Sequence, residues 1–334
     1  MQFIRPALLA TTILTASMTT AFADVRVVTS IKPVHSLVAA VMQGAGTPDL
    51  IVEGAGSPHT YALKPSQAKQ LQEADLVFWM SHDLEAFLEK SIDGIATKAV
   101  SVPLMESRGL MTLGFREGGA FDDHGHDEHD DQDEHDKDDD HDHEKHDDHD
   151  DHEKHNEHDH GEVDPHVWLD PENAKAMVHE IEEALAKADP ANAATYESNA
   201  EAVMAKLDSL VAEIDSELQP VKGRGYIVFH DAYQYFENRF GVSAIGSITV
   251  SPEVLPGAER ISDLQEKVRS LDATCVFSEP QFEPKLVATV TENTNARTGV
   301  LDPLGTAIDK GPNLYFTLIR NMASSLKNCL LGPG

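Results

Sequence analysis

Along most of the chain, short apolar runs alternate with longer segments in which apolar residues recur at helical spacing. The runs that predict buried strands are VRVVTS (25–30), LIVEGAG (50–56), DLVFWM (75–80), AVSVP (99–103), GYIVFH (225–230), VSAIGSITV (242–250), TCVFSEP (274–280) and TGVLDPLG (298–305). Continuous apolar strands separated by helices are typical of parallel sheets that are covered on both faces. The pattern therefore predicts an α/β fold with two such regions, residues 24–189 and 220–334.

One long helical pattern separates the two regions. Over residues 190–219, apolar positions recur at intervals of three and four from Tyr196 to Leu218. Pro190 lies near the start and Pro220 just past the end, which are the two places where a helix tolerates proline. About 28 helical residues span roughly 42 Å, which exceeds the radius of a small domain. A helix of this length can brace two lobes.

The first residues, MQFIRPALLATTILTASMTTAFA (1–23), predict a secretory signal peptide. A single Arg precedes a short apolar run, and Ala21-Phe22-Ala23 is the pattern at which such peptides are cleaved. The run is too short and too interrupted by Thr and Ser for a permanent membrane span, and a retained anchor is the alternative. We expect cleavage between Ala23 and Asp24 and export of the rest as a soluble protein.

An acidic, histidine-rich segment, residues 122–162, interrupts the first region. Of the net charge of −32, residues 122–160 contribute −18, and the remaining −14 is spread over the rest of the chain. A segment this polar cannot bury a core, so we expect a disordered surface insertion that binds several cations weakly. Its auxiliary metal ligands would be His124, His126, His129, His135, His141, His143, His146, His149, His152, His155, His158 and His160.

Charge and cysteine content narrow the classes of partner. An acidic chain has no basic face for phosphates, so nucleic acid is excluded as a partner and cations are favoured. An exported protein with two cysteines, Cys275 and Cys329, is expected to pair them in a disulfide, and two separate buried thiols are the alternative. The two lack CxxC spacing, which argues against a cysteine-based zinc site.

Four polar residues lie at or after the carboxyl ends of predicted strands, where parallel sheets bind ligands. His59 follows the run at 50–56, His166 follows the insertion in DPHVWLDP, His230 ends the run at 225–230, and Asp302 lies in TGVLDP. Two come from each region, so a site between the lobes would collect all four. Three imidazoles and a carboxylate suit Zn²⁺, whereas Mn²⁺ or Fe²⁺ would prefer more oxygen ligands.

Each of these residues also has an ordinary structural interpretation. A single His at a strand end is more often a hydrogen-bonding loop residue, and an Asp before Pro often caps a turn. The remaining histidines, His35, His82 and His179, lie in helical patterns or in a polar turn. We expect these three on the surface, with His82 the nearest to the pocket.

The motifs HTYALKPS, DPHVWLDP, FHDAYQYF, TCVFSEPQF and GVLDPLG, together with the His-rich insertion, resemble in this order the zinc-binding component of bacterial ABC importers, the ZnuA type of solute-binding protein. The resemblance covers nearly the whole mature chain. It implies two lobes, each with a parallel-type sheet flanked by helices, joined by one long rigid helix with the metal between them. It also implies a periplasmic, non-enzymatic monomer whose partners are an ABC permease and, as a further candidate, a periplasmic zinc chaperone.

Within this resemblance, His59, His166 and His230 match the zinc-ligating histidines of the family. Asp302 matches a carboxylate that ligates the metal in manganese-binding relatives and lies behind the ligands in zinc-binding ones. Zinc members often carry an acidic residue before the first histidine, whereas this chain has Pro58, so the fourth ligand is open between water, Asp302 and a histidine of the insertion. Cys275 and Cys329 match the disulfide pair of the zinc branch.

The function expected from this is high-affinity zinc capture in the periplasm and delivery to an inner-membrane permease, with the insertion as a metal collector or sensor. A manganese- or iron-binding protein of the same family is the nearest alternative. A zinc hydrolase would need a general base, for which Glu279 is the only evident candidate, and no HExxH motif is present. A metal buffer, in which the insertion is the main binding element, is the third alternative.

Overall fold

The computed structural model describes residues 25–116, 163–249, 252, 256–270 and 275–332. The predicted signal peptide and the acidic insertion with its twelve histidines lie outside the described residues. We call the part of the chain before the long helix the first lobe and the part after it the second lobe.

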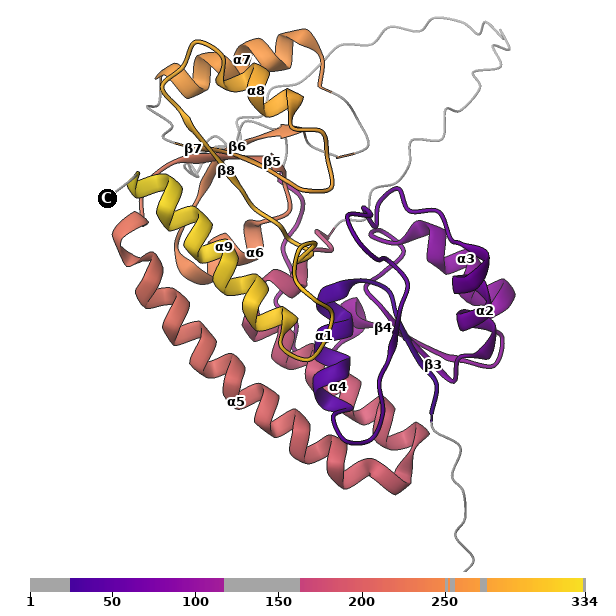
Figure 1. The fold of residues 1–334 in the computed structure, drawn as a ribbon. Coiled ribbons are helices and arrows are strands. Elements are labelled where there is room, and N and C mark those ends of the chain that lie inside the picture. The colour runs from indigo at the N-terminus through magenta and orange to yellow at the C-terminus, as the bar shows by residue number, and fades with distance from the viewer. Residues whose placement is uncertain (1–24, 117–162, 250–251, 253–255, 271–274, 333–334) are drawn as a thin grey trace, which may run out of the picture.

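Each lobe contains one four-stranded, fully parallel sheet (Figure 1). The order is β2-β1-β3-β4 in the first lobe and β6-β5-β7-β8 in the second, so both sheets have the same topology. The strands are β1 (Val27–Thr29), β2 (Asp49–Leu50), β3 (Leu76–Trp79), β4 (Val100–Pro103), β5 (Tyr226–His230), β6 (Ala244–Thr249), β7 (Cys275–Ser278) and β8 (Arg297–Val300). The predicted α/β class with two parallel sheets is confirmed.

Helices cover both faces of each sheet, as continuous apolar strands require. In the first lobe α2 and α3 lie on one face and α1 and α4 on the other; in the second lobe α7 and α8 lie opposite α6 and α9 (Figure 1). The bounds of these helices are α1 (Lys32–Val41), α2 (Pro65–Glu73), α3 (Ala86–Ile95), α4 (Pro171–Ala188), α6 (Gln234–Phe240), α7 (Ala258–Ser270), α8 (Lys285–Thr291) and α9 (Leu314–Leu331).

The long helix predicted for residues 190–219 is present and runs past both lobes (Figure 1). Its α-helical part is α5 (Ala193–Leu218), with one 3₁₀ turn before it at Pro190–Asn192 and one after it at Gln219–Val221. The apolar stripe of α5 packs against α1 and α4 of the first lobe and against α9 of the second. The buried positions are those of the predicted stripe: Tyr196, Ala200, Val203, Leu207, Leu210, Ile214 and Leu218.

The main hydrophobic core is shared by the two lobes. It runs from strands β1 and β3 through α5 into α9 and the α6 side of the second sheet. A smaller core, which includes Ile227, Phe229 and Ile248, fills the other face of that sheet under α7 and α8. Burying one large aliphatic side chain contributes about 1.5–3 kcal/mol, so the shared core strongly disfavours separating the lobes.

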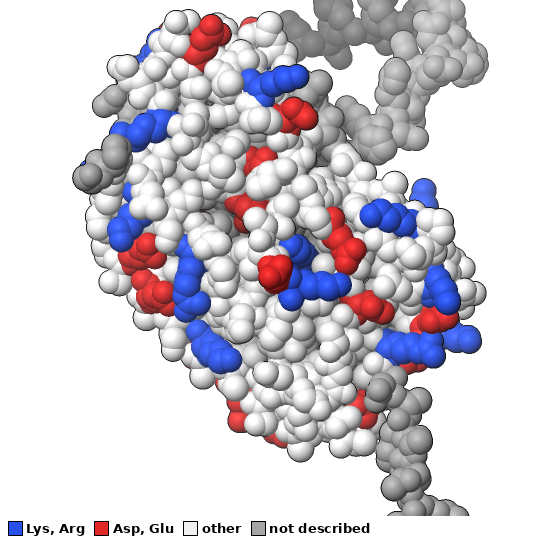
Figure 2. Space-filling model, in the orientation of Figure 1, with Lys and Arg blue, Asp and Glu red and all other residues white. Residues whose placement is uncertain are grey.

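Charged side chains of both signs share the face of the molecule that Figure 2 shows. On the face shown in Figure 2, Lys and Arg side chains are interspersed with Asp and Glu side chains over both lobes. Phosphate binding needs a continuous basic surface, and this view contains none. Among the described residues, no helix combines the length and the apolar character that crossing a membrane would require.

Cys275 of β7 and Cys329 of α9 form a disulfide, as predicted, with their Cα atoms 6.1 Å apart. The bond ties the last helix to the second sheet and closes a loop with a sequence separation of 54 residues. A loop of this size stabilises a fold by roughly 4 kcal/mol through the entropy of the unfolded chain.

Replacing both cysteines with alanine should therefore lower the free energy of unfolding by roughly 4 kcal/mol, as measured by urea denaturation. Wild-type protein unfolded in the presence of a reductant is the matched control and should show the same loss. Equal stability of the oxidised, reduced and double-variant proteins would contradict this role.

A second stability feature is Glu85, which is fully buried directly before α3. Its Oε2 accepts hydrogen bonds from the backbone N–H groups of Met80 (3.0 Å) and Ser81 (3.1 Å). Burial nevertheless raises the pKa of Glu85 to about 7, against hydrogen bonds from Ser30, Ser81 and Met80 that lower it. The folded protein therefore binds this proton more tightly than the unfolded chain, and stability falls as pH rises from about 4.5 through 7.

We expect Glu85→Gln, which mimics the protonated acid, to stabilise the protein at pH 8 by up to about 3 kcal/mol. The gain should shrink towards zero near pH 4, where the wild-type side chain is mostly protonated in both the folded and the unfolded state. Urea unfolding at the two pH values measures the effect, and the exposed Glu106→Gln serves as control. A gain that does not depend on pH would contradict the assignment.

Candidate metal centre

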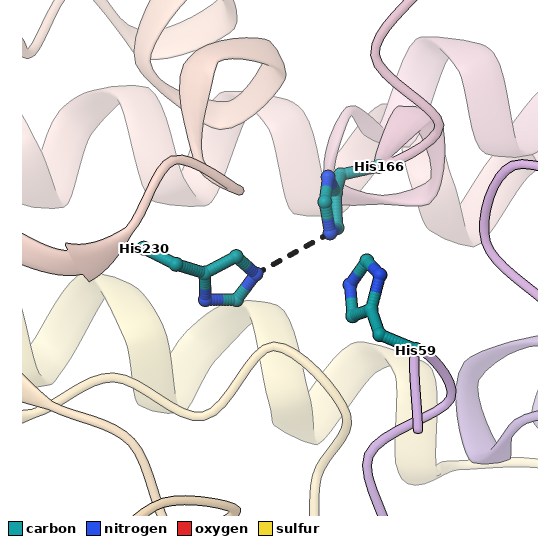
Figure 3. A group of neighbouring side chains, drawn as sticks. All are labelled: His59, His166 and His230. Carbon is teal, nitrogen blue, oxygen red and sulfur yellow. Dashed lines mark hydrogen bonds between the residues drawn. The ribbon is translucent and has the colours of Figure 1, made fainter. Parts of the chain in front are cut away.

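Three histidines from three separate segments converge between the lobes (Figure 3). His59 lies in the loop after β2, His166 directly precedes a 3₁₀ turn at Val167–Leu169, and His230 is the last residue of β5. Each offers one ring nitrogen, and these nitrogens all lie within 4.8 Å of one another. The three histidines that the sequence analysis singled out are therefore brought together.

The position of this cluster follows from the strand order of the second sheet. In this sheet β5 lies between β6 and β7. The chain runs outward from β5 to β6 on one side and from β7 to β8 on the other, so the strand order reverses between β5 and β7. Loops diverge at such a point and leave a crevice at the carboxyl edge of the sheet. His230 ends β5 and Glu279 directly follows β7, so the two residues face each other across this crevice.

Carboxylates orient two of the three imidazoles. Asp164 Oδ1 accepts hydrogen bonds from His166 Nδ1 (2.6 Å) and from the backbone N–H of His166 (3.0 Å). Glu279 Oε1 bonds in the same way to His230 Nδ1 (2.7 Å) and to the backbone N–H of His230 (3.3 Å). A carboxylate at Nδ1 holds the proton there, so the Nε2 lone pair of each ring is left for a ligand.

The two Nε2 atoms point at each other and are 3.4 Å apart (Figure 3). The ring centroid of His59 lies 5.5 Å from that of His166 and 5.8 Å from that of His230, so the His59 ring completes a triangle. Three lone pairs aimed at one point repel each other unless a cation or a proton lies between them. The arrangement can hold a single metal ion.

Electrostatics favour neutral imidazole at His59. Burial and the neighbouring His166 and His230 hold the pKa of His59 well below its usual range. At His230 burial also lowers the pKa, but the adjacent Glu279 carboxylate outweighs it and the net shift is upward. A metal ion and a proton thus compete for the His230 ring, and only the neutral ring ligates.

Apolar side chains line much of the pocket around the cluster. Trp168, Phe282, Pro303 and Leu304 line the pocket together with Pro58, and the cavity that remains is about 10 Å³, close to the size of one water molecule. His166 and His230 are each only 4% exposed. A cavity of this size fits one ion with one small ligand.

Comparison with known proteins identifies the family. A profile of the family described as "Zinc-uptake complex component A periplasmic" matches residues 27–329. The chain belongs to this family. It is 56% identical over 304 residues to the high-affinity zinc uptake system protein ZnuA of Brucella abortus (strain 2308), covering 91% of each chain. It is 35% identical over 338 residues to the protein of the same name from Yersinia pestis, covering 98% of each.

Solved structures support the fold of this zinc-uptake family. One titled "Crystal structure of ZnuA" superimposes with a TM-score of 0.71 at 22% identity, covering 92% of this chain and 99% of the other. At this level of identity the similarity concerns the fold, and the chemistry of the site has to be argued from the residues of this chain.

Asp302, the fourth candidate ligand, is used by its own turn. Its carboxylate accepts hydrogen bonds from the backbone N–H groups of Leu304, Gly305 and Thr306, from the Thr306 hydroxyl and from Gln281 Nε2. The cluster of mutually close ligand atoms consists of the three histidines, and within the described residues Asp302 reaches the pocket through Gln281, which lines it. This favours the interpretation of Asp302 as a residue behind the ligands.

The three remaining histidines differ in position. His82 and His179 have exposed side chains, at 60% and 61%, which confirms the surface position predicted for them, and each lies beside a surface glutamate. The prediction of a surface position is wrong for His35, which is 2% exposed. All ten residues of α1 are buried, because this helix lies between its sheet and both α5 and α9. Burial, with Lys310 nearby, lowers the pKa of His35 to about 4.

Sequence reasoning missed two roles in this site. Asp164 was not singled out, although it lies two residues before His166 and a carboxylate there can reach the histidine ring. Glu279 was considered only as a general base, whereas its Oε1 is bonded to His230. His230 and Glu279 are 49 positions apart in the sequence, and no local pattern reveals a contact between them.

Replacing Asp164 with Asn or Glu279 with Gln should weaken zinc affinity about 10–100-fold, because an amide orients the imidazole less firmly and makes it less basic. Chelator competition measures the affinity, and far-UV circular dichroism checks that the fold is retained. The exposed Asp208→Asn is the matched control and should bind as the wild type does. Equal affinity in all three variants would show that the carboxylates do not tune the site.

Proposed function

We propose that this protein captures Zn²⁺ in the periplasm through His59, His166 and His230 and delivers it to an inner-membrane ABC permease. The observation that carries the proposal is the 3.4 Å separation of the His166 and His230 Nε2 atoms. Two nitrogens bound at 2.0–2.1 Å in a tetrahedral arrangement lie roughly 3.3–3.4 Å apart. The two rings are thus already spaced as a tetrahedral zinc site requires.

The donor set favours zinc over manganese or iron. Three neutral imidazoles suit Zn²⁺, whereas Mn²⁺ and Fe²⁺ prefer more oxygen ligands. Asp302 would be the natural oxygen ligand, but its carboxylate is occupied by five hydrogen bonds to its own turn and to Gln281. Pro58 supplies no side-chain oxygen either. We infer that a water molecule completes the tetrahedron in the small remaining space.

Family membership supports the transport part of the proposal. The relatives named above are high-affinity zinc uptake proteins, and the family description is periplasmic. We therefore propose a periplasmic location, export by the segment 1–23, action as a monomer and a permease as the partner. The insertion at 122–162, which ends just before His166 in the sequence, would collect zinc weakly beside the tight site.

The hydrolase alternative has less support. A hydrolase needs a free general base beside the metal-bound water, and Glu279 holds the His230 ring with its Oε1. The cavity beside the three rings, at about 10 Å³, also has room for little more than one water molecule. The metal-buffer alternative leaves unexplained why three imidazoles and two carboxylates, none of which belongs to residues 122–162, converge on one point.

Zinc titration against a competing chelator tests this function. Wild-type protein should show one tight equivalent and several weak ones, and deletion of residues 122–162 should remove only the weak ones. His59→Ala should lose the tight equivalent, with an affinity loss beyond the roughly 10–100-fold typical of a residue behind a ligand. The exposed His179→Ala is the matched control.

Two results would count against the proposal. Unchanged tight binding in His59→Ala would exclude the three-histidine site. Loss of all binding on deletion of 122–162 would favour the metal buffer.

A further inference from the structure

His166 and His230 are almost fully buried and His59 is partly exposed, so an ion held by the three rings lies between walls that hinder its release. Both lobes contribute walls: Ser57 and Pro58 come from the loop of His59, and Pro303 and Leu304 come from the turn after β8. The bonds that join these two walls therefore oppose release of the ion.

One buried lysine bonds the first lobe to the turn that carries Pro303 and Leu304. Lys32, the first residue of α1 in the first lobe, is 8% exposed. Its Nζ donates to the carbonyls of Gly305 (3.0 Å), Thr306 (2.9 Å) and Ile308 (2.7 Å) in the second lobe. An ammonium group has three N–H donors, and all three are used on this one turn.

Both ends of this connection are rigid. On the second-lobe side, Asp302 accepts the N–H groups of the same turn whose carbonyls bind Lys32, so the turn is fixed from two directions. On the first-lobe side, Lys32 follows β1 closely, and Ser30 accepts the backbone N–H of Val52 at 2.8 Å. Val52 leads directly into the loop that carries His59.

Parting the two walls would break these bonds in a poorly hydrated interior. A hydrogen bond from a charged donor is stronger than a neutral one, and a buried ammonium left without acceptors is disfavoured further. By contrast, the ion pair between Lys310 and Glu53, which also crosses between the lobes, has side chains that are 55% and 52% exposed. Exposed pairs of this kind contribute little.

We propose that Lys32 is a positioning residue of the metal site, which holds the turn at 302–308 against the first lobe and so sets the rate at which bound zinc leaves. Lys32 contacts no ligand and acts through the wall formed by Pro303 and Leu304. This inference rests on the proposed function, because it concerns release of the same ion from the same three histidines.

The test is the rate of zinc release from full-length protein into excess chelator, followed by stopped flow. Lys32→Met keeps the apolar stem and removes the three donors, and it should raise the dissociation rate about tenfold or more. The association rate should stay within about threefold of the wild type, because an opened wall does not hinder entry. Lys310→Met removes the exposed ion pair with Glu53, which also crosses between the lobes. It is the matched control and should release zinc as the wild type does.

A second readout separates this role from a purely structural one. A tenfold rise in the dissociation constant lowers zinc-induced stabilisation by about 1.4 kcal/mol, so the gap between the unfolding temperatures of zinc-free and zinc-loaded protein should narrow. A purely structural role would lower both temperatures equally. Should Lys32→Met fail to fold, Lys32→Gln, which keeps two donors on a shorter side chain, should give an intermediate release rate.

The outcomes are distinguishable. Zinc that binds tightly to folded Lys32→Met and leaves within twofold of the wild-type rate would overturn the role of Lys32 and leave the proposed function intact. An equal acceleration in Lys310→Met would also overturn it, because any contact between the walls would then suffice. Wild-type protein without a tight zinc equivalent would instead refute the proposed function itself.

Discussion

The site depends on two hydrogen bonds, each between a carboxylate and a histidine ring. These bonds orient the rings so that two Nε2 lone pairs point at the same place. Asp164 and Glu279 each fix the proton on Nδ1, and the two acceptor nitrogens then face each other at 3.4 Å. An approach this close between two lone pairs is unfavourable in the absence of a cation, so the geometry stores an electrostatic preference for one. The rest of the fold has to keep these nitrogens at that distance.

Keeping them there is demanding, because the histidines belong to different lobes. His166 lies in the first lobe and His230 in the second, so a small rotation between lobes would change their separation. The shared core and the single rod of α5 resist such a rotation, since both lobes pack on the same helix. A further bond across the interface, from Trp168 Nε1 to the carbonyl of Pro303 at 2.9 Å, acts beside the metal pocket itself.

Sequence patterns predicted the elements well and the contacts between them poorly. The stripe from Tyr196 to Leu218 predicted α5, because helical periodicity and flanking prolines are local signals. The strand ends of parallel sheets pointed to the three histidines, because topology brings those ends together. His35 was misplaced because the polar residues of α1 suggested a solvent-facing side, whereas α5 and α9 cover this helix and their contacts leave no local pattern. The bonds of Lys32 to residues more than 270 positions away leave no pattern in the sequence.

A largely buried, preorganised site creates a problem of delivery. The same buried bonds that retain zinc also keep it from the permease, and thermal opening alone would be rare if the closed form is strongly favoured. A partner changes this only by binding the open form more tightly than the closed form. Moving a population from 1:99 to 99:1 takes a preference of about 5.5 kcal/mol. That amount is comparable to the loss of a few charge-assisted hydrogen bonds, so the three bonds of Lys32 are of the size that such a partner would have to offset.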